Sequence, residues 1–146
     1  MPWLLDTNGW ILFLKPHQSG GHAIAQRLAQ CDEEEILLCS VVKAELWHGA
    51  EKYENRTARR AKLDEIFVRY RSFSFDDAAA QHYASIRHHL ESRGQTIGPN
   101  DLQIAAICRA NDLTLVSTNT GEFGRVPGLR VEDWSQTPVK ADEPAP

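Results

Sequence analysis

Short apolar runs alternate along the chain with segments in which apolar residues recur at helical spacing. Runs of this kind, bounded by polar or turn residues, are typical of buried strands. We expect strands at residues 3–5, 35–40, 72–75, 114–117 and 129–131. Strands that alternate with helices favour a parallel sheet covered by helices, so the pattern predicts an α/β fold.

Helical spacing is clearest in two long segments, residues 55–70 and 76–93. In the second segment, Asp76 is expected to cap the helix N-terminus and Gly94 to end the helix. Asn100 is expected to cap the last of the shorter helices, which are predicted at residues 11–14, 23–29, 42–50 and 101–111. No internal repeat interrupts this order of elements.

The length of 146 residues suits one domain with a single core. Apolar residues make up 42% of the chain and charged residues 25%, as in an ordinary globular protein rather than a disordered or fibrous one. The domain is expected to span residues 1–134. Residues 135–146 carry three prolines and mixed charge, so a disordered tail is expected there.

The cysteines and the apolar runs indicate a cytoplasmic protein. Cys31, Cys39 and Cys108 lack metal-ligand spacing and are expected to be free thiols, as in a reducing compartment. The apolar N-terminus is broken by Asp6 and Asn8 and lacks the features of a secretory signal. No stretch approaches the roughly 20 apolar residues of a membrane span.

The net charge of −4 argues against nucleic-acid binding by overall charge, since proteins that bind in that way are usually basic. A nucleic-acid role would therefore need local basic patches or a metal. Two basic groups occur: Arg56, Arg59, Arg60, Lys62, Arg69 and Arg71, and then Arg87, His88, His89 and Arg93. Either group can hold phosphates, and the alternative is a solvated helix face.

Acidic and amide side chains fall where a parallel sheet would bring them together. Asp6 follows the first strand and Asn119 a late one, while Glu45 and Asp101 lie early in helices. Two such charges about 4 Å apart repel by roughly 1 kcal/mol in water and about 4 kcal/mol at an effective dielectric of about 20. Protons or a cation would relieve this repulsion, and a set of oxygen ligands favours Mg²⁺ or Mn²⁺.

We assign hypothetical roles to these residues. Asp6 and Asp101 would bind the metal directly, and Glu45 directly or through water. Asn119 would be a neutral ligand or would orient the attacking water, and Glu122 would supply another acid. Each residue has a structural alternative as a helix cap, above all the pair Asn100 and Asp101. Asp6 has no evident structural role after its apolar strand.

The segments around these acids resemble the motifs of PIN domains, and in particular the VapC toxins. The motifs are LLDTN at residues 4–8, SVVKAELWHG at 40–49, IGPNDLQIAA at 97–106 and LVSTNTGEF at 115–123. The segments VPGL at 126–129 and EDW at 132–134 resemble the ending of the VapC branch. The similarity extends over about residues 3–134.

This resemblance implies a three-layer α/β/α fold with a mainly parallel sheet. It also implies a Mg²⁺-dependent endoribonuclease, with Mn²⁺ as a possible substitute, that is neutralised by a cognate antitoxin and frequently forms a homodimer. The basic groups are then candidates for binding RNA or an acidic antitoxin segment. Many PIN domains have Asp where this chain has Asn119, which leaves open whether one metal or two are bound.

Other functions fit the sequence less well. A receiver-type signalling module needs an Asp at the end of a central strand, where this chain has Ser40 and Asn119. A phosphatase with an early Asp nucleophile needs a second Asp two residues later, where this chain has Asn8. A DNA-cleaving nuclease and a catalytically inactive interaction module, both of the same fold, stay open.

Overall fold

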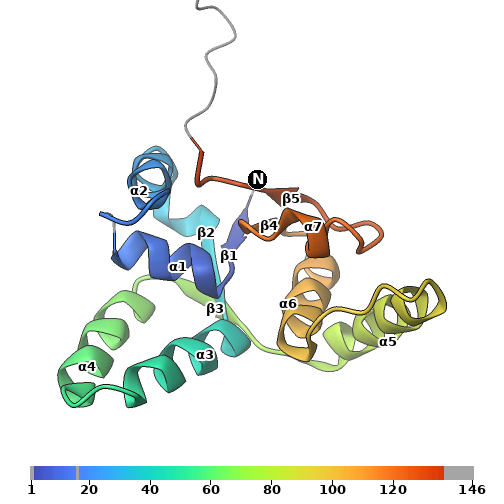
Figure 1. Cartoon of the computed structure of the whole chain (residues 1–146), viewed down its shortest axis with the longest axis horizontal. Coiled ribbons are helices and arrows are strands. Elements are labelled where there is room, and N and C mark those ends of the chain that lie inside the picture. The colour runs from blue at the N-terminus through green and yellow to red at the C-terminus, as the bar shows by residue number, and fades with distance from the viewer. Residues whose placement is uncertain (1, 16, 137–146) are drawn as a thin grey trace, which may run out of the picture.

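The computed structural model describes residues 2–15 and 17–136, which form one parallel sheet with helices on both sides (Figure 1). The sheet has the strand order β3-β2-β1-β4-β5, and every neighbouring pair is parallel. The strands are β1 (Trp3–Leu5), β2 (Ile36–Cys39), β3 (Arg71–Phe73), β4 (Thr114–Val116) and β5 (Val131–Glu132). The α/β fold with a parallel sheet that the sequence predicts is confirmed.

The helices form the two outer layers. They are α1 (Thr7–Leu14), α2 (Gly21–Ala29), α3 (Ser40–Glu51), α4 (Arg56–Phe67), α5 (Asp77–Ser92), α6 (Pro99–Ala110) and α7 (Thr120–Phe123), with a 3₁₀ turn at Glu33–Glu35. Figure 1 shows α1 to α4 on one side of the sheet and α5 and α6 on the other. None of the helices in the described part of the chain has the length and apolar character needed to cross a membrane.

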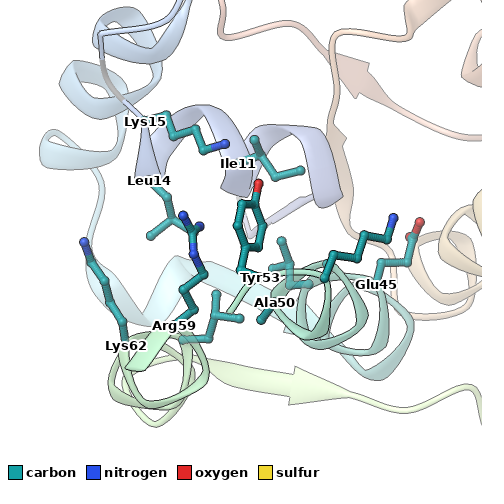
Figure 2. A pocket seen from close by; sticks show the side chains of 12 residues that line it. Ile11, Leu14, Lys15, Glu45, Ala50, Tyr53, Arg59 and Lys62 are labelled. Atoms are coloured by element: carbon teal, nitrogen blue, oxygen red, sulfur yellow. The ribbon is translucent and has the colours of Figure 1, made fainter. Parts of the chain in front are cut away.

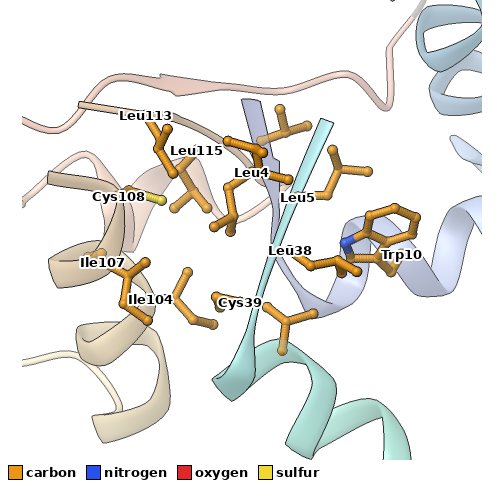
Figure 3. Close-up of a cluster of buried hydrophobic side chains, with 14 of the residues drawn as sticks. Leu4, Leu5, Trp10, Leu38, Cys39, Ile104, Ile107, Cys108, Leu113 and Leu115 are labelled. Atoms are coloured by element: carbon orange, nitrogen blue, oxygen red, sulfur yellow. The ribbon is translucent and has the colours of Figure 1, made fainter. Parts of the chain in front are cut away.

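The core lies around the central strand β1, as Figure 3 shows. Leu4 and Leu5 are fully buried and are flanked by Leu38 of β2 and Leu115 of β4. Burying a leucine side chain contributes roughly 1.5–3 kcal/mol, so these contacts hold the strand ends in a fixed register. Cysteines 31, 39 and 108 are all free, as expected.

The long helix α5 follows its sequence signals. The side chain of Asp76 accepts a hydrogen bond from the backbone N–H of Ala79 at 2.9 Å, as an N-cap does. Gly94, just beyond the helix, has a φ of +64°, a left-handed conformation that glycine adopts without steric cost. Both predictions for this helix are confirmed.

Several predicted boundaries differ from the structure by a few residues, and three of these differences lie beside the predicted site residues. Asn100 does not cap α6, because the helix already begins at Pro99 with Gly98 at the cap position, and proline suits the first helical position. Ser40 starts α3 rather than ending β2. The helix predicted at residues 11–14 begins earlier, at Thr7, since Asp6 caps it.

The C-terminal segment is packed against the first strand and α2. Trp3 donates a hydrogen bond from its indole nitrogen to Glu132 at 2.8 Å, and its ring lies edge-on to Trp134. Arg27 of α2 lies over the ring of Trp134 and pairs with Glu132. Of the predicted disordered tail, residues 137–146 lie outside the described residues.

Two glycines with positive φ offer a test of this packing. Gly94→Ala should lower the free energy of unfolding by about 1 kcal/mol, because a residue with a Cβ is disfavoured in the left-handed conformation. No further loss is expected, because in the described part of the chain no atom beyond the adjacent residues lies within 4 Å of the added Cβ. Gly20→Ala should cost more, because φ is +87° and the added Cβ would lie 2.8 Å from the Cβ of Ser135. Urea denaturation measures both losses, and a smaller loss for Gly20→Ala would contradict the packing.

Candidate functional site

Asp6 joins the end of β1 to the start of α1. One carboxylate oxygen accepts a hydrogen bond from the backbone N–H of Gly9 at 2.8 Å, so Asp6 is the N-cap of α1. The expectation that Asp6 has no structural role is therefore wrong. The second oxygen accepts a hydrogen bond from the Ser117 hydroxyl at 2.6 Å. The side chain is fixed at both oxygens while only 5% of the residue is exposed.

Ser117 links Asp6 to the segment after β4. Its hydroxyl donates to Asp6 and accepts from the backbone N–H of Asn119 at 2.9 Å, and the residue is buried. The backbone N–H of Asp6 also bonds to the carbonyl of Val116 at 3.0 Å. These contacts place the ends of β1 and β4 side by side at the carboxyl edge of the sheet, as the parallel arrangement predicts.

Glu45 reaches the same edge from the second turn of α3. Its carboxylate accepts a hydrogen bond from the hydroxyl of Thr7 at 2.8 Å. Its negative charge contributes to raising the pKa values of both Asp6 and Asp101, which shows that the three carboxylates share one electrostatic environment. The structure therefore brings together the three acids that the sequence singled out.

Asp101 lies in the first turn of α6 and is half-buried. Burial raises the pKa of its carboxyl group to about 6, with further contributions from the charges of Asp6, Glu45 and Glu122. Burial likewise raises the pKa of Asp6, partly offset by the hydrogen bonds from Ser117 and Gly9. Burial and neighbouring negative charge both disfavour the ionised form of a carboxyl group, so these two acids hold protons more strongly than free aspartates do.

Asn119 is hydrogen-bonded to two other residues of the site, Ser117 and Glu122. Its side-chain amide donates a hydrogen bond to a carboxylate oxygen of Glu122 at 3.0 Å. Glu122 is half-buried in α7, and its charge acts on Asp101. Asn119 is thus connected to the acidic centre through two contacts: its backbone N–H reaches Ser117 and its side chain reaches Glu122.

The donor set suits a hard divalent cation. Among the described residues, no three His, Cys, Asp or Glu side chains already form a group that could hold a metal ion. Mg²⁺, however, keeps several of its waters and needs only one or two direct carboxylate ligands. Uncompensated charge on Asp6 and Asp101, and oxygen donors alone at the centre, fit such an ion better than zinc.

A groove runs from the acidic centre between α1, α3 and α4. It has a volume of about 340 Å³ and includes Glu45 in its lining. Figure 2 shows Glu45 near one end and Lys62 near the other, with Tyr53 and Arg59 between them. The apolar lining is formed by Ile11, Leu14, Leu46, Ala50 and Leu63, and the basic lining by Lys15, Lys52, Arg59 and Lys62.

The predicted basic groups are divided by the fold. Arg59 and Lys62 of the first group line the groove, and the guanidinium of Arg59 lies 3.5 Å from the ring centre of Tyr53. Arg69 instead pairs with Glu33. In the second group, Arg87 pairs with Glu91 on its own helix. Part of each predicted basic group is therefore taken up in ion pairs on the surface.

Sequence reasoning missed two residues of the site, Thr7 and Ser117. Both are hydroxyl residues within motifs that the sequence did contain, directly after Asp6 and shortly before Asn119. Nothing in the local pattern indicated their partners, because the bonded residues are 38 and 111 positions apart.

Comparison with known proteins places this geometry among the PIN domains. A model of the family "PIN domain" matches residues 3–129. The tRNA(fMet)-specific endonuclease VapC of Shigella flexneri is 35% identical over 92% of this chain and 99% of its own. The DNA-bound VapBC of Salmonella typhimurium has a TM-score of 0.83 at 31% identity, over 92% of this chain and 98% of that one. VapBC-5 of Mycobacterium tuberculosis, from a family of toxin–antitoxin systems, has a TM-score of 0.57 at 28% identity, over 67% and 79%.

The raised pKa of Asp101 predicts how the metal-free protein responds to pH. Between pH 3.8, the ordinary pKa, and about 6, the folded protein holds more protons on Asp101 than the unfolded chain does. The free energy of unfolding should therefore fall as pH rises through this window. Asp101→Asn should flatten the slope and raise the melting temperature at pH 7. Calorimetry in EDTA measures both quantities, and an unchanged slope would contradict the assignment.

Proposed function

The chain belongs to the PIN domain family, and on that basis we propose that it is a VapC-type endoribonuclease that hydrolyses RNA at a divalent-metal site formed by Asp6, Glu45 and Asp101. Mg²⁺ is the proposed metal, with Mn²⁺ as a substitute. The protein would be the toxin component of a toxin–antitoxin pair. The observation that carries the proposal is the gathering of these three carboxylates at one edge of the sheet with two raised pKa values.

The proposed mechanism follows from how the side chains are held. A bound divalent cation would neutralise charge on the scissile phosphate and lower the pKa of a water. Gly9 and Ser117 fix both oxygens of Asp6, so this ligand needs little reorganisation when a cation binds. Asp101 is less buried than Asp6 and would complete the site from the opposite helix layer.

Glu122 is our candidate for a fourth acid, in the place where Asn119 lacks a charge. The hydrogen bond from Asn119 directs one oxygen of Glu122, and the charge of Glu122 already acts on Asp101. In this proposal Asn119 orients Glu122, and the Glu122 carboxylate would help to hold a cation or orient a water. Asn119, which replaces the Asp common in the family, would then orient the carboxylate of Glu122 three residues later.

The groove is our candidate for the antitoxin site. Its apolar floor suits the nonpolar face of a helix or an extended segment, and its four basic residues suit acidic side chains on that segment. Because Glu45 lines both the groove and the acidic centre, a segment bound here would end beside the catalytic acids. This gives a direct physical route from antitoxin binding to loss of cleavage.

We further propose that the protein acts in the cytoplasm and as a homodimer. Three free cysteines among the described residues suit a reducing compartment. The proposal of a homodimer rests on the family resemblance. Sedimentation of the purified protein measures its oligomeric state directly. RNA phosphates would be held by basic residues outside the groove that the ion pairs leave available.

Cleavage of RNA is the first expected outcome. Purified protein, freed of any antitoxin, should cut RNA in Mg²⁺ or Mn²⁺ but not in EDTA. The substrates are a mixed RNA pool, single-stranded DNA and tRNA(fMet), which the Shigella flexneri relative is named for. Asp6→Asn and Asp101→Asn should each lower kcat by about 100-fold or more, since a 1 Å misplacement alone can cost about that much.

The matched control is Asp77→Asn, an exposed acid in the first turn of α5, which should cleave like the unaltered protein. Cleavage of DNA alone would favour the DNA-cleaving alternative. Absence of cleavage together with absence of Mg²⁺ binding by calorimetry would refute the proposal and favour the inactive interaction module.

Charge reversal in the groove should weaken the antitoxin. The double variant Arg59→Glu with Lys62→Glu should need at least about 10-fold more cognate antitoxin to halve RNA cleavage, because like charges would face each other across the interface. Cleavage without antitoxin should remain. Arg93→Glu, which reverses an exposed charge outside the groove, is the control. Equal antitoxin requirements for all three proteins would exclude the groove as the docking site.

A further inference from the structure

A hydroxyl group joins two of the acid-bearing segments. Thr7 is the first residue of α1 and directly follows Asp6, and it donates a hydrogen bond to Glu45 across 38 positions of sequence. The distance between the Thr7 hydroxyl oxygen and the Glu45 carboxylate oxygen is 2.8 Å. Asp6 and Glu45 are therefore connected through a single residue, in addition to their electrostatic coupling.

Glu45 has two environments open to it. Its charge acts on Asp6 and Asp101 at the acidic centre, yet its side chain also lines the groove between α1, α3 and α4. Within residues 2–15 and 17–136, the bond from Thr7 is the one hydrogen bond that the Glu45 carboxylate accepts from another side chain. A glutamate side chain has several rotatable bonds. Without the hydrogen bond from Thr7, the Glu45 carboxylate would therefore occupy conformers directed to the acidic centre and others directed to the groove.

Thr7 is well placed to restrict that motion. Its backbone is the first helical position of α1, which Asp6 caps through Gly9. A β-branched threonine has few χ1 rotamers in a helix, so the position of its hydroxyl is largely fixed. The bond engages one carboxylate oxygen of Glu45 and leaves the other for a metal or a metal-bound water.

We propose that Thr7 is a positioning residue of the metal site, which holds the Glu45 carboxylate toward Asp6 and Asp101 and out of the groove. The proposal rests on the proposed metal-dependent nuclease function. Thr7 itself touches neither metal nor substrate in this proposal. Its action passes entirely through Glu45, so the effect of removing the hydroxyl must depend on the presence of the glutamate.

The test begins with three single variants of the full chain. Thr7→Val keeps the branched shape and removes the hydroxyl, and Thr7→Ser keeps the hydroxyl. Thr57→Val makes the same change at an exposed threonine of α4 and is the matched control. Mn²⁺ binding is measured by calorimetry, RNA cleavage gives kcat and KM, and urea denaturation reports stability.

Thr7→Val should weaken Mn²⁺ binding by about 10-fold or more and lower kcat by a similar factor with little change in KM, since outer partners of metal ligands typically contribute about 10–100-fold. Thr7→Ser and Thr57→Val should stay within about twofold of the unaltered protein. In a Glu45→Ala background, which removes the acceptor, Thr7→Val should have no further effect on Mn²⁺ binding, because the two residues act as one unit.

Three results would overturn the proposal: unchanged Mn²⁺ affinity in Thr7→Val, equal damage in Thr7→Ser and Thr7→Val, or a full additional effect in the Glu45→Ala background. A loss of stability without a change in Mn²⁺ affinity belongs to the first of these. If the unaltered protein cleaves no RNA, the proposed nuclease function fails, while the Mn²⁺ measurements still decide the role of Thr7.

Discussion

The burial of several carboxylates close together at the carboxyl edge of the parallel sheet is the constraint on which the rest of the site depends. Parallel strands all end at the same edge, so Asp6 after β1, the helix α3 after β2 and the segment after β4 bring their polar groups to one place. Burial, with the charges of the neighbouring carboxylates, raises the pKa of Asp101 to about 6, and burial also raises that of Asp6. The fold tolerates this cost because a buried sheet with several fully buried leucines fixes the strand ends.

Hydroxyl and amide groups, rather than cations, support these acids in the described residues. Ser117 holds Asp6, Thr7 holds Glu45, and Asn119 holds Glu122. Neutral donors orient a carboxylate without cancelling its charge, whereas an arginine or lysine would satisfy it and compete with a metal ion. The acids therefore remain oriented and uncompensated, which is the condition a divalent cation requires. The same arrangement leaves Glu45 exposed to whatever occupies the neighbouring groove.

Most of the fold could be predicted from the sequence, and the exceptions have local causes. The strands and the long helix α5 follow from apolar spacing, the Asp76 cap and the positive φ of Gly94. The prediction for Asn100 failed because Pro99 starts α6 one residue earlier, a preference that outweighs a cap residue within the helix. Among the acids, Asp6 had the weakest case for a structural role on sequence grounds, yet Asp6 caps α1.

The sequence by itself determined the order of strands and helices and the kind of chemistry at the strand ends, because hydrophobic spacing and residue type are local properties of the chain. It also contained the family motifs around Asp6, Glu45 and Asp101. Only the tertiary structure decided which groups hold these acids and that Glu45 borders a groove as well as the centre. Those contacts join residues 38 and 111 positions apart, and such pairings arise only when packing brings distant segments together.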